Sequence, residues 1–145
     1  MAVVKKVRHK ETFIGKLRHG ADLLEEITEI CKMENIQLGR IEAIGAVRNA
    51  CIGFYNQERH EYKFITIDQP LEITNLKGNI SLKDGNPFVH AHITLSDSSG
   101  NAYGGHLAPG TIVFAGELMI EAFDGLLLER GFDQETGLSL WSIKE

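Results

Sequence analysis

The amino-acid sequence predicts an α+β domain in which one main helix near the N-terminus accompanies a large, curled sheet of antiparallel or mixed strands. Two observations predict this class. Only one stretch has the apolar spacing of a helix, and it falls early, between residues 20 and 35. Most of the remaining chain reads as strands separated by glycine or asparagine. One early helix is too few for a doubly wound parallel sheet, in which helices alternate with strands.

The predicted helix, residues 20–35, has one apolar stripe. Its apolar residues recur at spacings of three and four: Leu23, Leu24, Ile27, Ile30 and Cys31. This spacing gathers them on one face, where they can be buried, and it leaves Glu25, Glu26 and Glu29 on the outer face. Asp22 precedes the stripe, where a carboxylate suits the unpaired amides and positive dipole end of a helix.

The strand-like segments are rich in isoleucine, valine, phenylalanine and threonine. They cover residues 39–47, 49–56, 60–67, 71–83, 87–97, 102–107, 111–123 and 126–131. So many strands require a large sheet, which we expect to curl and to be barrel-like.

Length and composition indicate one ordinary globular unit. A chain of 145 residues is near the usual size of one domain, and it contains no internal repeat or linker, so we expect a single domain over residues 1–145. No window approaches the roughly 18 uninterrupted apolar residues of a membrane span. Charges interrupt the N-terminal residues where a secretory signal is apolar, so we expect a cytoplasmic protein that does not contact membranes.

The charge balance argues against unaided binding to nucleic acid. The net charge is -5, whereas association with DNA depends on lysines and arginines that neutralise phosphates. The one basic cluster lies near the N-terminus and comprises Lys5, Lys6, Arg8 and Lys10. We interpret this cluster as part of a solvated first strand.

The two cysteines, Cys31 and Cys51, lack the close spacing of a zinc knuckle or redox pair, and we expect two buried thiols.

Two histidines stand on the polar side of the predicted strand 87–97. Alternation points Val89, Ala91, Ile93 and Leu95 one way and His90, His92, Thr94 and Ser96 the other. With a rise of about 3.3 Å per residue, the two histidine Cβ atoms lie roughly 7 Å apart, so both imidazoles can lean onto an ion at about 2.1 Å. An H-x-H strand is therefore a platform with two metal ligands.

The register of the next hairpin predicts a third histidine ligand. Residues 97–101 form a turn, and a three-residue loop with Gly100 in the left-handed conformation pairs Asp97 with Asn101. Counting outward from that pair sets His106 across from His92, on the same face. A two-residue loop would instead place His106 on the opposite face. We therefore predict a divalent metal site formed by His90, His92 and His106, provided that the loop has three residues.

The ligand set and the next strand bear on the chemistry. An all-imidazole set favours zinc, with nickel, iron or copper as alternatives, because affinity alone does not select the metal. Three protein ligands leave a coordination position open, as in catalytic zinc sites. In residues 111–123, alternation separates the carboxylates Glu117 and Glu121 from the apolar Ile112, Phe114, Leu118 and Ile120. Glu117 is the candidate catalytic base; a fourth ligand, a hydrogen-bond acceptor behind a ligand, and a solvated or ion-paired carboxylate are its other possible roles.

Several segments together resemble a known family. They are Gly45-Ala46-Val47, Pro70-Leu71-Glu72-Ile73, His90-Ala91-His92, the turn from Asp97 to Gly100, and Gly104-Gly105-His106-Leu107. From Phe13 to about Phe123 the chain is similar to the plants-and-prokaryotes-conserved domain, called PPC. The resemblance implies an α+β fold that assembles as a homotrimer and, in some prokaryotic members, a metal held by the positions of His90, His92 and His106.

Two classes of function follow. The first is a metal-binding homotrimer that carries out metal-dependent chemistry on a small molecule. The second is an oligomeric, DNA-associated or regulatory binding module without catalysis, because plant members of the family follow AT-hook segments and prokaryotic members are often called predicted DNA-binding proteins. This chain has no Arg-Gly-Arg-Pro element of the AT-hook kind, so binding of DNA by the isolated chain is not expected. Whether the protein is an enzyme is left open by the sequence.

Overall fold

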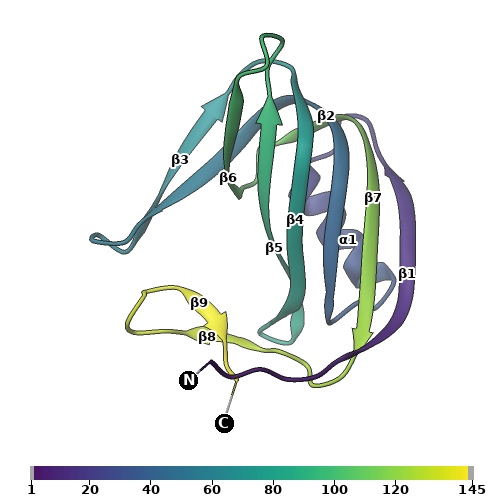
Figure 1. The fold of residues 1–145 in the computed structure, drawn as a ribbon, viewed down its shortest axis with the longest axis vertical. Coiled ribbons are helices and arrows are strands. Elements are labelled where there is room, and N and C mark those ends of the chain that lie inside the picture. Colours follow the sequence, from purple (N-terminus) through teal and green to yellow (C-terminus); the bar gives the residue numbers. More distant parts are fainter. Residues whose placement is uncertain (1, 144–145) are drawn as a thin grey trace.

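An antiparallel sheet curled around one helix makes up most of the molecule in the computed structural model, which describes residues 2–143 (Figure 1). The helix α1 spans Leu23–Met33. The strands are β1 Arg8–Leu17, β2 Gly39–Asn56, β3 Glu61–Ile67, β4 Leu71–Lys83, β5 Asn86–Ser96, β6 Ala102–Leu107, β7 Ile112–Asp124, β8 Arg130–Phe132 and β9 Ser139–Trp141. The predicted α+β class with one early helix is confirmed.

The long strand β2 organises the sheet. The main sheet has the order β1-β7-β2-β4-β5-β6, and β3 pairs with β2 outside this path. The first half of β2 lies between β4 and β7, whereas its second half pairs with β3 and, at Ile52 and Gly53, with β6. Because β6 returns to β2, the strands β2, β4, β5 and β6 close into a ring. The sequence predicted two strands, residues 39–47 and 49–56. The structure has one bent strand here, and its register shifts at bulges.

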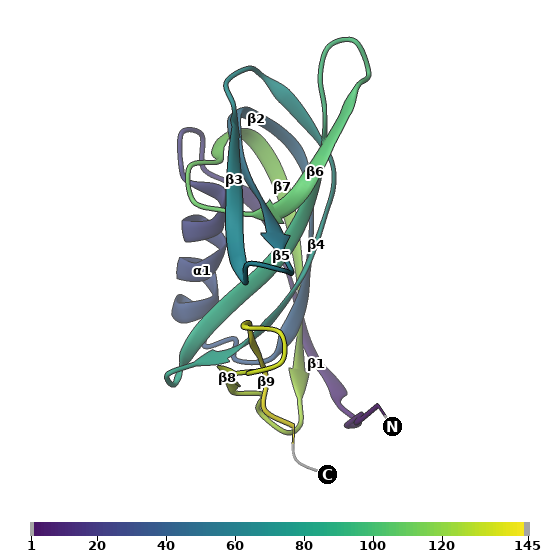
Figure 2. The same cartoon turned by 90° about the vertical axis from the view of Figure 1, so that its left-hand side faces the viewer.

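The core lies between α1 and the inner face of the sheet (Figure 2). Leu23, Ile27 and Cys31 of the helix are fully buried against residues of the sheet. Asp22 caps the helix, because its Oδ1 accepts hydrogen bonds from the backbone amides of Leu24 and Glu25. These contacts confirm the predicted stripe and the predicted role of Asp22.

Glu26 corrects the expectation that the helical glutamates all lie on the outer face. It is buried, and Arg18 Nε donates to its two carboxylate oxygens at 2.9 and 3.0 Å. This hydrogen bonding keeps the Glu26 pKa below its ordinary value, even though burial acts in the opposite direction. The buried carboxylate is tolerated at the edge of the core because Arg18 donates hydrogen bonds to it.

Strand β7 and the C-terminal segment differ from the predicted pattern. Ala46 pairs with Ala115 but Val47 pairs with Val113, so Phe114 is an additional, bulged residue of β7. The bulge reverses the alternation, so that Val113 is buried and Phe114 is exposed, whereas Leu118 and Ile120 point inward as predicted. The predicted strand 126–131 begins only at Arg130.

The basic cluster and the cysteines lie as the sequence predicts, with one exception. The cluster of Lys5, Lys6, Arg8 and Lys10 is exposed along the start of β1 and the residues before it. Cys31 is buried as predicted, but Cys51 is only partly buried.

Within residues 2–143, no helix has both the length and the apolar character needed to cross a membrane.

The alternation of β5 gives a testable prediction. Ile93→Ala should lower the free energy of unfolding by about 2–4 kcal/mol, since Ile93 is fully buried in the core and its loss opens a cavity. Thr94→Ala, one residue further and on the exposed face, should change it by no more than about 0.5 kcal/mol. Urea denaturation measures both values, and equal losses at the two positions would contradict the assignment of faces.

Candidate metal centre

A tight turn fixes the register between β5 and β6. The Asp97 amide donates to the Asn101 carbonyl at 3.0 Å, and the Gly100 amide donates to the Asp97 carbonyl at 3.0 Å. Gly100 has a φ of 79°, the left-handed conformation that glycine adopts most readily. The loop therefore has three residues, as predicted, and His92 lies directly opposite His106 in the ladder.

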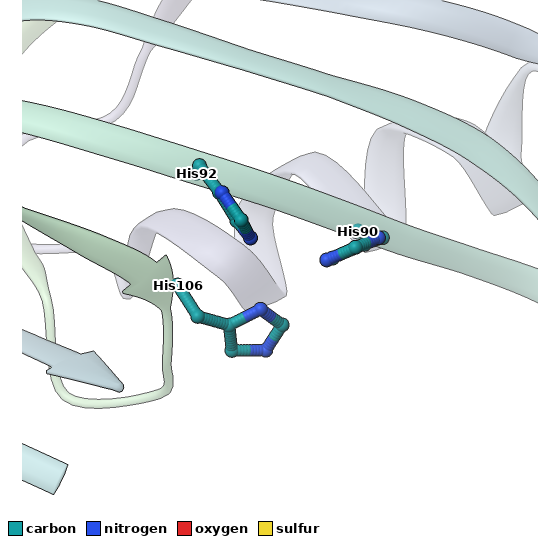
Figure 3. Close-up of side chains that lie close together, drawn as sticks. All are labelled: His90, His92 and His106. Carbon is teal, nitrogen blue, oxygen red and sulfur yellow. The ribbon is translucent and has the colours of Figure 1, made fainter. Parts of the chain in front are cut away.

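The three predicted histidines converge on one point, and their rings face a common space (Figure 3). The ring centroids are 5.2 Å apart for His90 and His92, 5.1 Å for His90 and His106, and 5.7 Å for His92 and His106. One nitrogen from each ring lies within 4.8 Å of the others. A tetrahedral ion with bonds of about 2.1 Å needs nitrogens about 3.4 Å apart, so small side-chain rotations suffice.

The surroundings of the imidazoles fit a metal ion. The Nδ1 atom of His106 is buried and has no hydrogen-bond partner among the described residues. A buried polar atom without a partner costs free energy. Coordination of a metal ion by the His106 imidazole is one way to recover this free energy. The donor set, three imidazoles with one open side, is that of zinc and related divalent metals.

Burial favours the neutral, metal-binding form of His90 and His106. Burial lowers the pKa of His90 to about 4, with smaller contributions from the charges of His106, Arg130 and His92. Burial also lowers the pKa of His106, followed by the charges of His92 and Arg130. A neutral imidazole keeps a lone pair for a ligand bond, so these rings are free of competing protons at neutral pH.

Tyr62 of β3 forms one wall of the site, which the sequence did not reveal. Its ring lies 4.8 Å from the His106 ring, centroid to centroid. Gly53 makes this contact possible, because a Cβ there would come within 3.1 Å of the rings of Tyr62 and Phe64. Gly53 pairs with both Phe64 and His106, but the pairing of β2 with β6 joins segments about fifty residues apart and has no local sequence signal.

Arg130 of β8 is a second neighbour that the sequence did not reveal. Its guanidinium donates to Asn79 Oδ1 at 2.9 Å, and Asn79 is the cross-strand partner of His90. Arg130 therefore lies at the edge of the histidine cluster. Its sequence context, three leucines and a glutamate after β7, does not indicate this position.

Glu117 is not brought together with the histidines in a single chain. It is exposed on β7, opposite Lys16 of β1 and Ile44 of β2, and the strands β2 and β4 lie between β7 and β5 in the sheet. Glu121 is engaged elsewhere, since Arg40 Nε donates to it at 2.6 Å. The other three histidines, at positions 9, 19 and 60, are exposed and lie outside the cluster.

Comparison with solved structures finds close relatives of this fold. A metal-containing protein from Archaeoglobus fulgidus is 42% identical with a TM-score of 0.92, and the match covers 97% of this chain and 99% of that one. A plant- and prokaryote-conserved (PPC) protein from Pyrococcus horikoshii is 36% identical with a TM-score of 0.92 over 99% of both chains. A candidate DNA-binding protein from Bacteroides thetaiotaomicron is 27% identical with a TM-score of 0.84, over 94% of this chain and 96% of that one.

Curated sequences add two longer relatives. Bifunctional GlmU proteins from two Synechococcus strains are 30% identical over 100 residues, a match that covers 68% of this chain but only 15% of each relative. The chain thus corresponds to a small part of those proteins. The model of the Plants and Prokaryotes Conserved (PCC) domain matches residues 4–124 and includes all three histidines. The chain therefore belongs to the Plants and Prokaryotes Conserved domain family that its histidine motifs resemble.

Proposed function

We propose that this protein is a homotrimer that binds one divalent metal, with zinc as the first expectation, at His90, His92 and His106 of each subunit and uses it in chemistry on a small molecule. The observation that carries the proposal is the convergence of three imidazoles whose nitrogens lie within 4.8 Å of one another. The metal content of the A. fulgidus protein, which shares 42% of its residues with this chain, supports it. The cytoplasmic location expected from the sequence stays a prediction.

Each residue of the site has a role in this proposal. The imidazoles hold the ion, and burial keeps His90 and His106 unprotonated so that binding does not have to displace protons at neutral pH. Tyr62 covers one side of His106 and limits access of water to it. An ion held by three ligands supplies Lewis acidity at its open coordination position. Glu117 remains a proposed base only if another subunit brings it to the site, because its own chain does not.

An apolar outer surface supports self-association. Ile14 of β1, Ile44 of β2 and Met119 of β7 are large apolar side chains on adjoining strands, and they are 78%, 57% and 46% exposed. They line a groove of about 640 Å³ together with Glu117 and other residues of these strands. Contiguous exposed apolar surface of this kind marks an interaction site. Three subunits is the number that the family resemblance implies.

A DNA-associated function is the second candidate. It is favoured by the exposed basic cluster of Lys5, Lys6, Arg8 and Lys10 and by the candidate DNA-binding protein from B. thetaiotaomicron, which shares the fold at 27% identity. Three copies of the cluster on one face of a trimer would make a local positive patch. The net charge of -5 per chain opposes this function.

The metal site is tested by His92→Ala. We expect this variant to lose stoichiometric metal, because His92 is the ligand flanked by His90 on its own strand and by His106 across the ladder. Its fold should survive, since His92 is exposed and the buried face of β5 is unchanged. Protein purified without a histidine tag is dialysed against a weak chelator, and plasma emission measures the metal.

Two matched variants control this experiment. His60→Ala removes an exposed histidine outside the cluster and should retain the metal of the original protein. Glu117→Gln should retain it as well unless Glu117 of a neighbouring subunit is a ligand. Stoichiometric metal in His92→Ala would show that the three-histidine site is wrong.

Oligomer formation is tested on the apolar outer surface. Sedimentation equilibrium should give about 48 kDa, three times the 16.1 kDa of one chain. Ile44→Glu should shift the mass towards the monomer, because a charge buried in an interface is costly. Met33→Glu, at a position on α1 that is 74% exposed, should leave the mass unchanged. A mass near 16 kDa for the original protein across the micromolar range would exclude a stable trimer.

Binding of DNA by the isolated chain is expected to be weak or absent at physiological salt, because the net charge repels phosphates. Fluorescence anisotropy of a labelled duplex, with the salt concentration varied, measures the affinity. A sub-micromolar dissociation constant that weakens with salt, and weakens further when Lys5 and Lys6 are replaced by Gln, would favour the DNA-associated function instead.

A further inference from the structure

Arg130 is a buried cation bound only to neutral groups. It is 9% exposed, and its guanidinium donates to Ser81 Oγ, Asn79 Oδ1 and the Ser139 carbonyl at 2.8, 2.9 and 2.9 Å. The rings of Phe88 and Trp141 lie 5.0 and 5.9 Å from it. These contacts fix its position without neutralising its charge.

No carboxylate within residues 2–143 forms an ion pair with Arg130. Desolvation lowers the pKa of Arg130, and Tyr62 acts in the opposite direction. A buried charge without an opposite charge is costly, so such charges are normally paired or coordinated. An arginine has five N–H donors, and its three hydrogen bonds leave two donors without an acceptor among residues 2–143.

Arg130 lies near the histidine cluster, on the face of the sheet that carries His90. Its Asn79 partner is the cross-strand neighbour of His90, and its charge acts on both His90 and His106. The segment that carries it is held in place at a second point, where the Tyr55 hydroxyl of β2 donates to the Thr136 carbonyl at 2.7 Å. These two sets of hydrogen bonds therefore hold the guanidinium near the histidine cluster.

We propose that the site takes a small molecule bearing an oxyanion, a carboxylate or a phosphate, with one oxygen towards the metal position and another accepting a hydrogen bond from Arg130. This inference rests on the proposed metal function and names its substrate class. A divalent ion bound by the three imidazoles would add two positive charges near the guanidinium, and the two cations would repel each other unless an anion lay between them. Within the described residues, the group of possible ligands contains no carboxylate that could serve.

Burial selects a small anion over a nucleic-acid backbone. Arg130 is enclosed by Phe88, Trp141 and the neutral acceptors, so a duplex phosphate cannot approach it without displacing them. Arginine suits this task because its planar donors stay charged at any ordinary pH and match the geometry of an oxyanion. Arg130 also lies beyond residues 4–124, which the family model matches. The C-terminal segment thus completes a site whose metal ligands belong to the family domain.

The experiment is isothermal titration of inorganic phosphate and, separately, of acetate into the zinc-loaded protein. We expect Arg130→Gln to keep its zinc but to bind the preferred anion about 10- to 100-fold more weakly, as the loss of a charge-assisted hydrogen bond implies. Arg48→Gln removes an exposed arginine in the middle of β2 that is not part of the histidine cluster, and this variant should bind like the original protein. The two anions distinguish a phosphate from a carboxylate as the recognised group.

Each other outcome is decisive. Unchanged anion affinity in zinc-loaded Arg130→Gln would overturn the role of Arg130 while leaving the metal function intact. Equal affinity in the zinc-free original protein would overturn the bridging arrangement, and no binding of either anion would overturn the inference itself. If Arg130→Gln does not fold, a crystal structure of the zinc-loaded original protein with the anion serves instead. We expect an anion oxygen within hydrogen-bond distance of the guanidinium, and an anion away from Arg130 would refute the proposal.

Discussion

The register between β5 and β6 is the constraint on which the site depends. Side chains alternate between faces, so a shift of one residue would move His106 to the opposite face from His92. Asp97 fixes the register, since its Oδ1 accepts from the amides of Ser99 and Asn101 and its Oδ2 accepts from the Tyr103 hydroxyl. Hydrogen bonds from Asn101, Tyr103 and Ser99 also hold the Asp97 pKa below its ordinary value. The charged carboxylate at the turn thus determines whether three imidazoles can meet.

Features that depend on residues close in sequence could be predicted, whereas features that depend on residues far apart in sequence could not. The alternation of β5 and the three-residue turn are local, so the face and meeting point of His90, His92 and His106 could be predicted. The bulge at Phe114 could not, because it arises from the pairing of β7 with β2. The same holds for Tyr62 and Arg130, which reach the site from strands distant in sequence. Glu117 was assigned from alternation alone, and alternation does not tell which strands are neighbours.

The long strand β2 separates two regions on the outer surface of one sheet. Its first half carries Ile44, within the apolar surface shared with β1 and β7. Its second half carries Gly53, against which Tyr62 packs beside His106. A strand that changes partners along its length can serve both regions. The histidine cluster lies near the other end of the strand, next to β3 and the C-terminal hairpin, so Glu117 in the first region could reach it only from another subunit.

The energetics of the site point beyond the protein chain itself. The Nδ1 atom of His106 lacks a partner among the described residues, and Arg130 is buried without a counter-charge within residues 2–143. Each feature costs free energy in the isolated chain. A cation bound through this nitrogen would recover the first cost but increase the second by repulsion. An anion beside the cation would offset that repulsion, so the physical argument that favours a metal also favours a negatively charged ligand next to it.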